Sequence, residues 1–298
     1  FNKKKYPLCN KYFFSKIETF EKNYKDRFFF FFFNFFLNIF LFFQNKNYPS
    51  IGVRLLDLHS DQNISEEVNV NKFFNKNFSL PTKDELNFYE ILKKNTNYSE
   101  GQKIVTIHFR DEIYRNDKGR RMYRNSSIKN SYDAIKYLIQ KGYYVIRVGN
   151  LSKDKFDFNN KNFLDYSFSE LISEKLDLLL IKNSSFFIGT QSGLTEIAYL
   201  FNVPVMLLNM YQLFEGYPKK KCDRGLFKKI FFKEEKISLN EFMNLSPIYH
   251  NSLVHNLKFI NNLDFQENES SEITSSIQTF ESLYSYNNLE SHSMDQQK

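Results

Sequence analysis

The sequence predicts an α/β protein with a Rossmann-like parallel sheet and helices on both of its faces. Short apolar runs, of a length typical of buried strands, occur at 104–109, 144–148, 185–189 and 203–208. Amphipathic stretches of about 10–15 residues, the length of helices that connect parallel strands, lie between these runs. A turn of small polar residues at 189–193 joins one strand to the helix that follows it.

Composition and charge limit the possible functions. The chain has 298 residues, of which 42% are apolar and 25% charged, which fits a soluble protein of one or two domains. A net charge of +7 suits an anionic partner. Nucleic-acid binding has only this charge and a Lys- and Tyr-rich background in its favour, so we expect no nucleic-acid partner. Cys9 and Cys222 lack metal-ligand spacing, which fits a reducing, cytoplasmic compartment without a disulfide framework.

Three regions follow from the pattern. We interpret 1–100 as an incomplete N-terminal region, 101–248 as the Rossmann-like domain and 249–298 as a tail. The first residue is Phe1 rather than Met, so the N-terminal part is interpreted as truncated or irregular.

A phenylalanine-rich segment, Phe28–Phe43, is the most unusual part of the first region. Its sixteen residues are interrupted by Asn34 and Asn38, and a membrane-spanning helix usually needs about 20 apolar residues. The segment is either a buried or interfacial helix, a membrane anchor, or a low-complexity run. Peripheral membrane contact through this segment therefore stays open.

Signals at the element ends place the first helices and strands. Thr82 and Glu85 have the spacing of a capping box, which predicts a helix to about Lys94. Ser131 is placed to cap a helix that Gly142 ends. A short strand is expected at 162–166, and Ser169 is expected to cap the next helix, which runs through Leu171, Leu176, Leu179 and Leu180.

The last part of the chain shows weaker signals. After Met210 the sequence is basic and irregular, with a last helix expected at 239–245. Residues 249–298 contain an acidic stretch rich in Ser, Glu and Asn, which predicts a mostly disordered tail with a weak helix near 273–284.

The turn at 189–193 has the chemistry of an anion site. Small residues let a ligand approach the backbone, and the free N–H groups of a helix N-terminus attract anions. Thr190, Ser192 and Thr195 add hydroxyl groups beside that helix end, and Gln191, Gly193 and Glu196 belong to the same segment. The alternative is a plain strand-to-helix turn with Ser192 as the cap.

Polar side chains also follow the two preceding strands, at the edge where α/β proteins bind ligands. His108, Arg110 and Asp111 end the first strand, and Arg147 and Gly149 end the second. Arg110 suits a phosphate, and His108 suits a base or an orienting group. The alternative is structural: His108 and Arg110 pair with Asp111 or Glu112. For Asp165 and Tyr166 we favour loop hydrogen bonds over contact with a base or ribose.

The loop at 111–124 has two interpretations. It closes over an acidic substrate, or it is a solvated surface loop, which is the better interpretation for any single arginine. Its cations are Arg115, Lys118, Arg120, Arg121 and Arg124. The sequence has no Gly-x-Gly-x-x-Gly, Walker, HExxH or Asp-x-Asp motif. We therefore expect no metal and no cofactor.

Three segments in order, VTIHFRDEIY, YYVIRVGN and FIGTQSGLTEIAYLFNVPVMLL, resemble a group of bacterial glycosyltransferases. More distantly, residues 103–213 are similar to the C-terminal domain of GT-B glycosyltransferases, including fucosyltransferases and heptosyltransferases. In such enzymes this domain binds a nucleotide-sugar, usually without a metal. An N-terminal Rossmann domain binds the acceptor, and only about 100 residues precede the matching region here.

The resemblance implies a hexosyl- or deoxyhexosyltransferase of polysaccharide biosynthesis that acts on a cell-surface glycan or lipid-linked acceptor. The donor diphosphate would contact Arg110, Thr190, Gln191, Ser192 and Gly193, with Arg147 and Gly149 lining the cleft and Thr195 and Glu196 beside them. His108 and Asp111 are the candidates for a base or an orienting group. The alternative is a catalytically inactive domain that binds a nucleotide-sugar or a glycan.

Overall fold

The chain divides into two compact units, Phe1–Ser79 and Leu80–Lys298. The computed structural model describes residues 82–111, 113, 122–149, 152–211, 218–220, 222–244 and 262–295, all in the second unit. The predicted helix at 28–43 lies outside the described residues. The sheet-containing unit begins at Leu80 and includes the helix α5 (Thr82–Asn95), which packs against a helix of the sheet domain.

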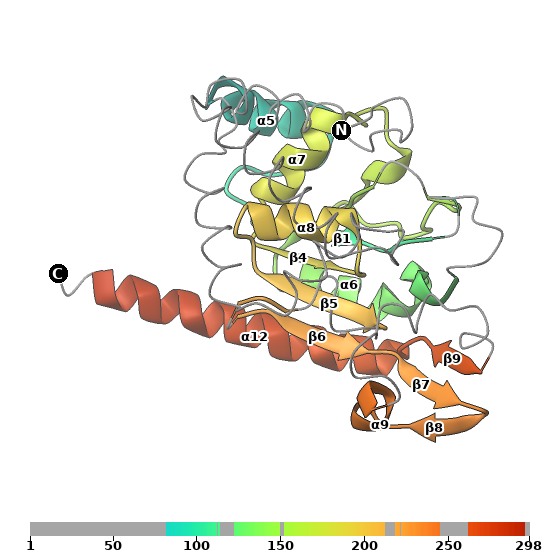
Figure 1. Cartoon of the computed structure of the whole chain (residues 1–298). Coiled ribbons are helices and arrows are strands. Elements are labelled where there is room, and N and C mark those ends of the chain that lie inside the picture. Colours follow the sequence, from blue (N-terminus) through green and yellow to red (C-terminus); the bar gives the residue numbers. More distant parts are fainter. Residues whose placement is uncertain are drawn as a thin grey trace, which may run out of the picture. The chain divides into compact units, whose positions relative to one another are not determined.

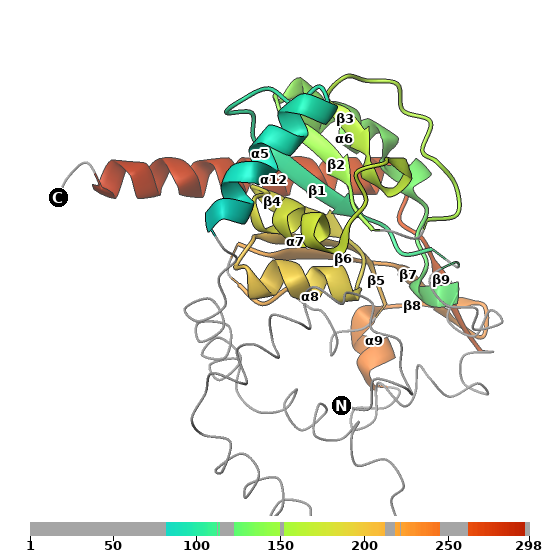
Figure 2. The same cartoon turned by 90° about the horizontal axis from the view of Figure 1, so that it is seen from above.

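Six parallel strands of the described region form one sheet in the order β3-β2-β1-β4-β5-β6 (Figures 1 and 2). The chain starts in the middle, builds outward to β3, and then returns to add β4 beside β1. This order defines the Rossmann fold, so the predicted fold class is confirmed. The strands are β1 (Ile104–His108), β2 (Tyr144–Arg147), β3 (Phe163–Asp165), β4 (Phe186–Gly189), β5 (Val205–Met210) and β6 (Arg224–Phe227).

Helices cover both faces of this sheet (Figure 2). On one face α5 lies beside α7 (Glu174–Lys182), which lies beside α8 (Gly193–Leu200). On the other face α6 (Tyr132–Gln140) packs along α12 (Ser270–Asp295). Short 3-10 helices form at η2 (Met122–Arg124), η3 (Ile128–Ser131) and η4 (Tyr166–Phe168).

The C-terminal region corrects the sequence prediction of a mostly disordered tail. Residues 262–295 form the strand β9 (Leu263–Gln266) and α12, while 249–261 lie outside the described residues. Ile273, Ile277 and Phe280 are buried in the main core against α6 and the sheet. Burying such side chains stabilises the fold by roughly 1.5–3 kcal/mol each, which outweighs the weak helix propensity of the surrounding Ser and Asn residues.

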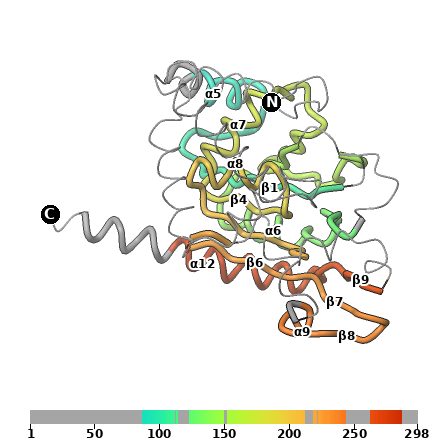
Figure 3. Tube along the Cα trace, viewed as in Figure 1, coloured from blue at the N-terminus to red at the C-terminus, as the bar shows by residue number. Residues whose placement is uncertain are grey.

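A small antiparallel sheet follows β6, where the sequence predicted irregular chain. Its order is β8-β7-β9, with β7 at Lys229–Phe232 and β8 at Glu235–Ile237. Figure 3 traces the path from β6 into β7 and from β9 into α12. The helix α9 (Leu239–Asn244) confirms the helix predicted at 239–245, although α12 follows it in the chain.

One helix begins later than predicted. Ser173, not Ser169, caps α7, and its hydroxyl accepts from Leu176 N at 3.1 Å. Ser169 instead closes a turn, where its hydroxyl accepts from Leu171 N and donates to Tyr166 O. None of the helices in the described part of the chain is both long and apolar enough to cross a membrane.

Candidate functional site

The carboxyl ends of β1 and β4 meet at the point where the strand order reverses. His108 pairs with Gly189 in the sheet register. Beyond this pair, Thr190 N donates to His108 O at 3.1 Å, and Arg110 N donates to Thr190 Oγ1 at 3.0 Å. Ligands of open α/β sheets bind at this position. The structure therefore brings two of the predicted site residues, Arg110 and Thr190, into direct contact.

Gly189 allows this close approach of the two strands. A Cβ atom at this position would lie 2.6 Å from His108 O and 2.8 Å from the Phe187 ring. Backbone atoms cannot yield at such distances without moving a strand, so glycine is required where β4 passes His108. The sequence motif thus has a packing cause before any functional one.

Most hydroxyl groups of the turn stabilise the turn itself. Thr195 Oγ1 donates to Thr190 O at 2.8 Å, and both residues are buried. Ser192 Oγ lies 3.4 Å from Thr195 Oγ1. Ser192 is half-buried, and Gly193, the first residue of α8, is exposed, with no other atom within 4 Å of the place that a Cβ atom would take. Within the turn, the part that an anion can reach is therefore Ser192–Gly193, at the N-terminal end of α8.

Two further predicted residues make contacts outside the turn. Gln191 Oε1 accepts from Tyr211 N at 3.0 Å, which fixes the turn to the end of β5. Glu196 is exposed on the first turn of α8 and pairs with Lys219 Nζ at 3.0 Å. Gln191 and Glu196, which were both predicted to contact the donor, thus each bind another residue of the chain.

Arg110 is 7% exposed, and its side chain is held by a residue that the sequence analysis did not single out. Its Nη1 donates to Asn125 Oδ1 at 2.8 Å. The next residue completes the contact, since Ser126 N donates to Arg110 O at 2.9 Å. The loop before α6 therefore packs against Arg110.

His108 is packed between the ends of β1 and β2. Its Nδ1 lies 3.1 Å from Val148 O, and a Cβ atom on Gly149 would come within 2.9 Å of the same nitrogen. Gly149 has φ of +114°, a second reason for glycine here. Burial, with a smaller effect of Arg147, lowers the pKa of His108 to about 4. The imidazole is neutral near pH 7, and its basicity is low for the predicted role of catalytic base.

Asp111 connects two loops. Its Oδ2 accepts from Lys153 N at 2.7 Å, and its Oδ1 accepts from Ile113 N at 3.1 Å. Both carboxylate oxygens thus bind backbone amides, which favours an orienting role over that of a base.

Arg147, predicted to line the cleft, is held by partners within the chain. Its Nη1 lies 3.2 Å from Asp165 Oδ2 and 3.0 Å from Asp154 O. The side chains of Arg147 and Asp165 are only 4% and 6% exposed, and Asp165 also accepts from Phe156 N. The guanidinium is thus part of a buried ion pair between the last residues of β2 and β3. Asp165 forms the loop hydrogen bonds that we favoured from the sequence.

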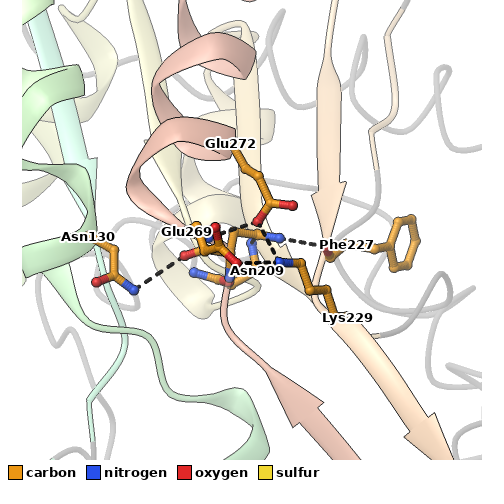
Figure 4. Close-up of polar contacts among 7 residues, drawn as sticks. Asn130, Asn209, Phe227, Lys229, Glu269 and Glu272 are labelled. Atoms are coloured by element: carbon orange, nitrogen blue, oxygen red, sulfur yellow. Dashed lines mark hydrogen bonds and ion pairs between the residues drawn. The ribbon is translucent and has the colours of Figure 1, made fainter. Parts of the chain in front are cut away.

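A buried asparagine pair supports the loop that holds Arg110. Asn209 N donates to Asn268 Oδ1 at 3.0 Å, and Asn268 N donates to Asn209 Oδ1 at 2.6 Å. Asn209 has φ of 53° and donates from Nδ2 to Ser126 Oγ. Figure 4 shows Asn209 beside Glu269, the residue that directly precedes α12. The C-terminal segment therefore helps to position the candidate site.

Lys228 is a further cation that the sequence analysis did not assign to the site. It follows β6 directly, and its Nζ donates to Asn125 O at 2.6 Å. The only sequence signal was the Lys228-Lys229 pair, which is ambiguous without knowledge of β6. In the described region no group of three or more His, Cys, Asp or Glu side chains is arranged to hold a metal ion.

No protein-family model matches the sequence, and a search of curated proteins gives no significant match. Among solved structures, the chain is similar to E. coli ADP-heptose lipopolysaccharide heptosyltransferase II at 13% identity and a TM-score of 0.37, covering 59% of this chain and 52% of that one. A family 9 glycosyltransferase from Veillonella parvula matches at 9% identity and a TM-score of 0.43, covering 68% and 52%. The heptosyltransferase TibC, solved with ADP-D-β-D-heptose, matches at 20% identity and a TM-score of 0.25, covering 38% and 28%.

The chain spans about half the length of the first two of these proteins. These likenesses are too distant to carry an argument about activity, and the fold class rests on the strand order itself.

Proposed function

We propose that this chain is a glycosyltransferase that moves a sugar from a nucleotide-sugar donor to a cell-surface glycan or lipid-linked acceptor. One observation carries the proposal: Arg110 and Thr190 are hydrogen-bonded where the strand order reverses, beside the open N-terminus of α8. That position favours a phosphate-bearing ligand. The ordered sequence motifs that resemble bacterial glycosyltransferases point to the nucleotide-sugar class.

In this proposal the donor diphosphate lies over Ser192–Gly193. The first-turn amides and the positive end of the α8 dipole face it, and Arg110 lies on the neighbouring strand. Negative charge grows on the departing diphosphate as the sugar leaves. Fixed donors and cations stabilise that charge without reorganisation, so transfer is expected without a metal.

A negative charge introduced at Gly193 tests the site. Because nothing lies within 4 Å of a Cβ there, and acidic residues suit a helix N-terminus, Gly193→Asp should fold normally. Its carboxylate should abolish the thermal stabilisation that nucleoside diphosphates give, whereas the uncharged Gly193→Asn should retain most of it. Equal stabilisation of both variants by UDP, GDP, ADP or CDP would place the ligand elsewhere. Transfer is then assayed by mass spectrometry with a chelator present.

A second candidate function is a domain that binds a nucleotide-sugar or glycan without transfer. One observation favours it: His108 and Asp111, the predicted bases, are both engaged with backbone groups. Nucleoside diphosphate binding without a product from any nucleotide-sugar in a donor panel supports this alternative. A transfer product contradicts it.

A further inference from the structure

Lys228 carries a buried ammonium group at the carboxyl edge of the sheet. The residue is 4% exposed, and its Nζ donates to Asn125 O. Among the described residues, no carboxylate lies within 4.0 Å of this nitrogen. A buried cation without an ion pair is costly, because it loses hydration without gaining a counter-charge.

The nearest acidic groups only partly offset this charge. Glu267 and Asp264 raise the pKa of Lys228 through their charge, yet burial is the larger effect and the pKa falls to about 8. The Glu267 carboxylate is already engaged, since its Oε2 accepts from Ser127 N at 2.8 Å and from Asn130 Nδ2 at 3.4 Å. The charge of the Lys228 ammonium group is therefore only partly offset by its surroundings.

Asn125 connects Lys228 to Arg110. The asparagine accepts from Arg110 Nη1 through its side chain and from Lys228 Nζ through its backbone oxygen. Two cationic side chains from different strand ends thus share one residue. Arg110 in turn contacts Thr190, so Lys228 is joined to the turn at 189–193 by a chain of direct hydrogen bonds.

Arg124 adds a third cation from η2. Its guanidinium lies 5.5 Å from the centroid of the Tyr211 ring, and its Nε is buried without a hydrogen-bond partner. Tyr211 N is bound by Gln191 of the turn. An unsatisfied buried donor is a second sign that this edge of the sheet is built for an acceptor from outside the described chain.

We propose that Arg110, Arg124 and Lys228 form one anion-binding cluster around Asn125, in which Lys228 and Arg124 bind the diphosphate of the ligand. The inference rests on the proposed function, because it takes the donor diphosphate to lie at this same edge. The inference adds Arg124 and Lys228 to the residues that contact the donor. Their role follows from charge, because three cations complement a doubly charged diphosphate better than Arg110 alone. Binding supplies the missing counter-charge and raises the pKa of Lys228.

Calorimetric titration of the full chain with inorganic pyrophosphate tests the cluster. Lys228→Met keeps the buried stem and removes the charge, and it should fold because an apolar group replaces an unpaired ion. Lys236→Met removes the same charge from an exposed position on β8. We expect affinity to fall at least about tenfold in Lys228→Met and to stay unchanged in Lys236→Met.

The possible outcomes separate the two proposals. If Lys228→Met binds pyrophosphate as tightly as the wild type, the cluster is overturned while the proposed function stands. If the wild type binds neither pyrophosphate nor any nucleoside diphosphate, both are overturned. If Lys228→Met loses its cooperative melting transition, the pyrophosphate affinity of Arg124→Met is measured instead. This variant should fold more readily, because Arg124 is only half-buried. About fivefold weaker binding supports the cluster, and unchanged affinity overturns it.

Discussion

The backbone amide of Arg110 donates to the side-chain hydroxyl of Thr190 at 3.0 Å, across a sequence separation of 80 residues. This bond holds the chain that leaves β1 against the chain that leaves β4. On one side of this bond Asn125 holds the Arg110 side chain, and on the other the turn into α8 extends from Thr190.

Removing the Thr190 hydroxyl should destabilise the protein. Thr190→Val leaves the buried Arg110 amide without this acceptor, and we expect a loss of about 1–3 kcal/mol in the free energy of unfolding. Thr190→Ser keeps the hydroxyl and should retain most of that free energy. Urea unfolding followed by circular dichroism measures both. A valine variant as stable as the serine variant contradicts the importance of this bond.

The two glycines that flank the turn should respond in opposite ways to alanine. In Gly189→Ala the new methyl group meets His108 O at 2.6 Å, so we expect a loss of about 1–3 kcal/mol from strand displacement. In Gly193→Ala nothing lies within 4 Å, and the more restricted unfolded chain should leave stability equal or raise it by up to about 1 kcal/mol. Thermal melts of the two variants compare them directly, and a tolerated Gly189→Ala refutes the close approach.

Arg147 should matter for folding rather than for ligand affinity. Arg147→Met leaves Asp165 as a buried unpaired carboxylate, and we expect a loss of about 3–5 kcal/mol. Glu196→Gln, which breaks the more exposed pair with Lys219, should cost less than about 1 kcal/mol. Chemical denaturation measures both variants. An Arg147→Met protein of wild-type stability that binds nucleoside diphosphates poorly would restore the donor contact predicted from the sequence.

Asp177 should make stability depend on pH. Burial raises its pKa from 3.8 to about 6, so the folded state favours the neutral carboxyl. That contribution is fully present below about pH 3.8 and is lost as the pH rises through about 6. Asp177→Asn should therefore be more stable than the wild type at pH 7, by up to about 3 kcal/mol, and equally stable near pH 3.5. Unfolding free energies at several pH values test this, and a constant difference contradicts it.

The sequence was sufficient for the central strands and not for the edges of the domain. Apolar runs such as 104–109 are unambiguous because parallel strands are buried on both faces. The sixth strand, Arg224–Phe227, is only partly buried and lies among lysines, so it has no such run. Helix α12 did carry a signal, since Ile273, Ile277 and Phe280 share one helical face, but the polar residues between them lowered its apparent hydrophobicity.

The candidate site shows the same division. Arg110 and Thr190 could be placed together because parallel strand ends meet at one edge. Whether a charged residue at that edge faces a ligand or a buried partner depends on side-chain packing, which is why Arg147 was assigned to the cleft. Lys228 was missed because its position depends on a strand that periodicity could not detect.

The packing of α12 also bears on how this protein folds in the cell. Phe186 on β4 lies 5.4 Å, centroid to centroid, from Phe280, which the ribosome adds much later. During synthesis α6 covers only part of the sheet face that carries Phe186, and the rest of that face stays exposed until α12 emerges. The nascent protein therefore cannot complete its core strand by strand, and it presents an apolar surface that chaperones can recognise while translation continues.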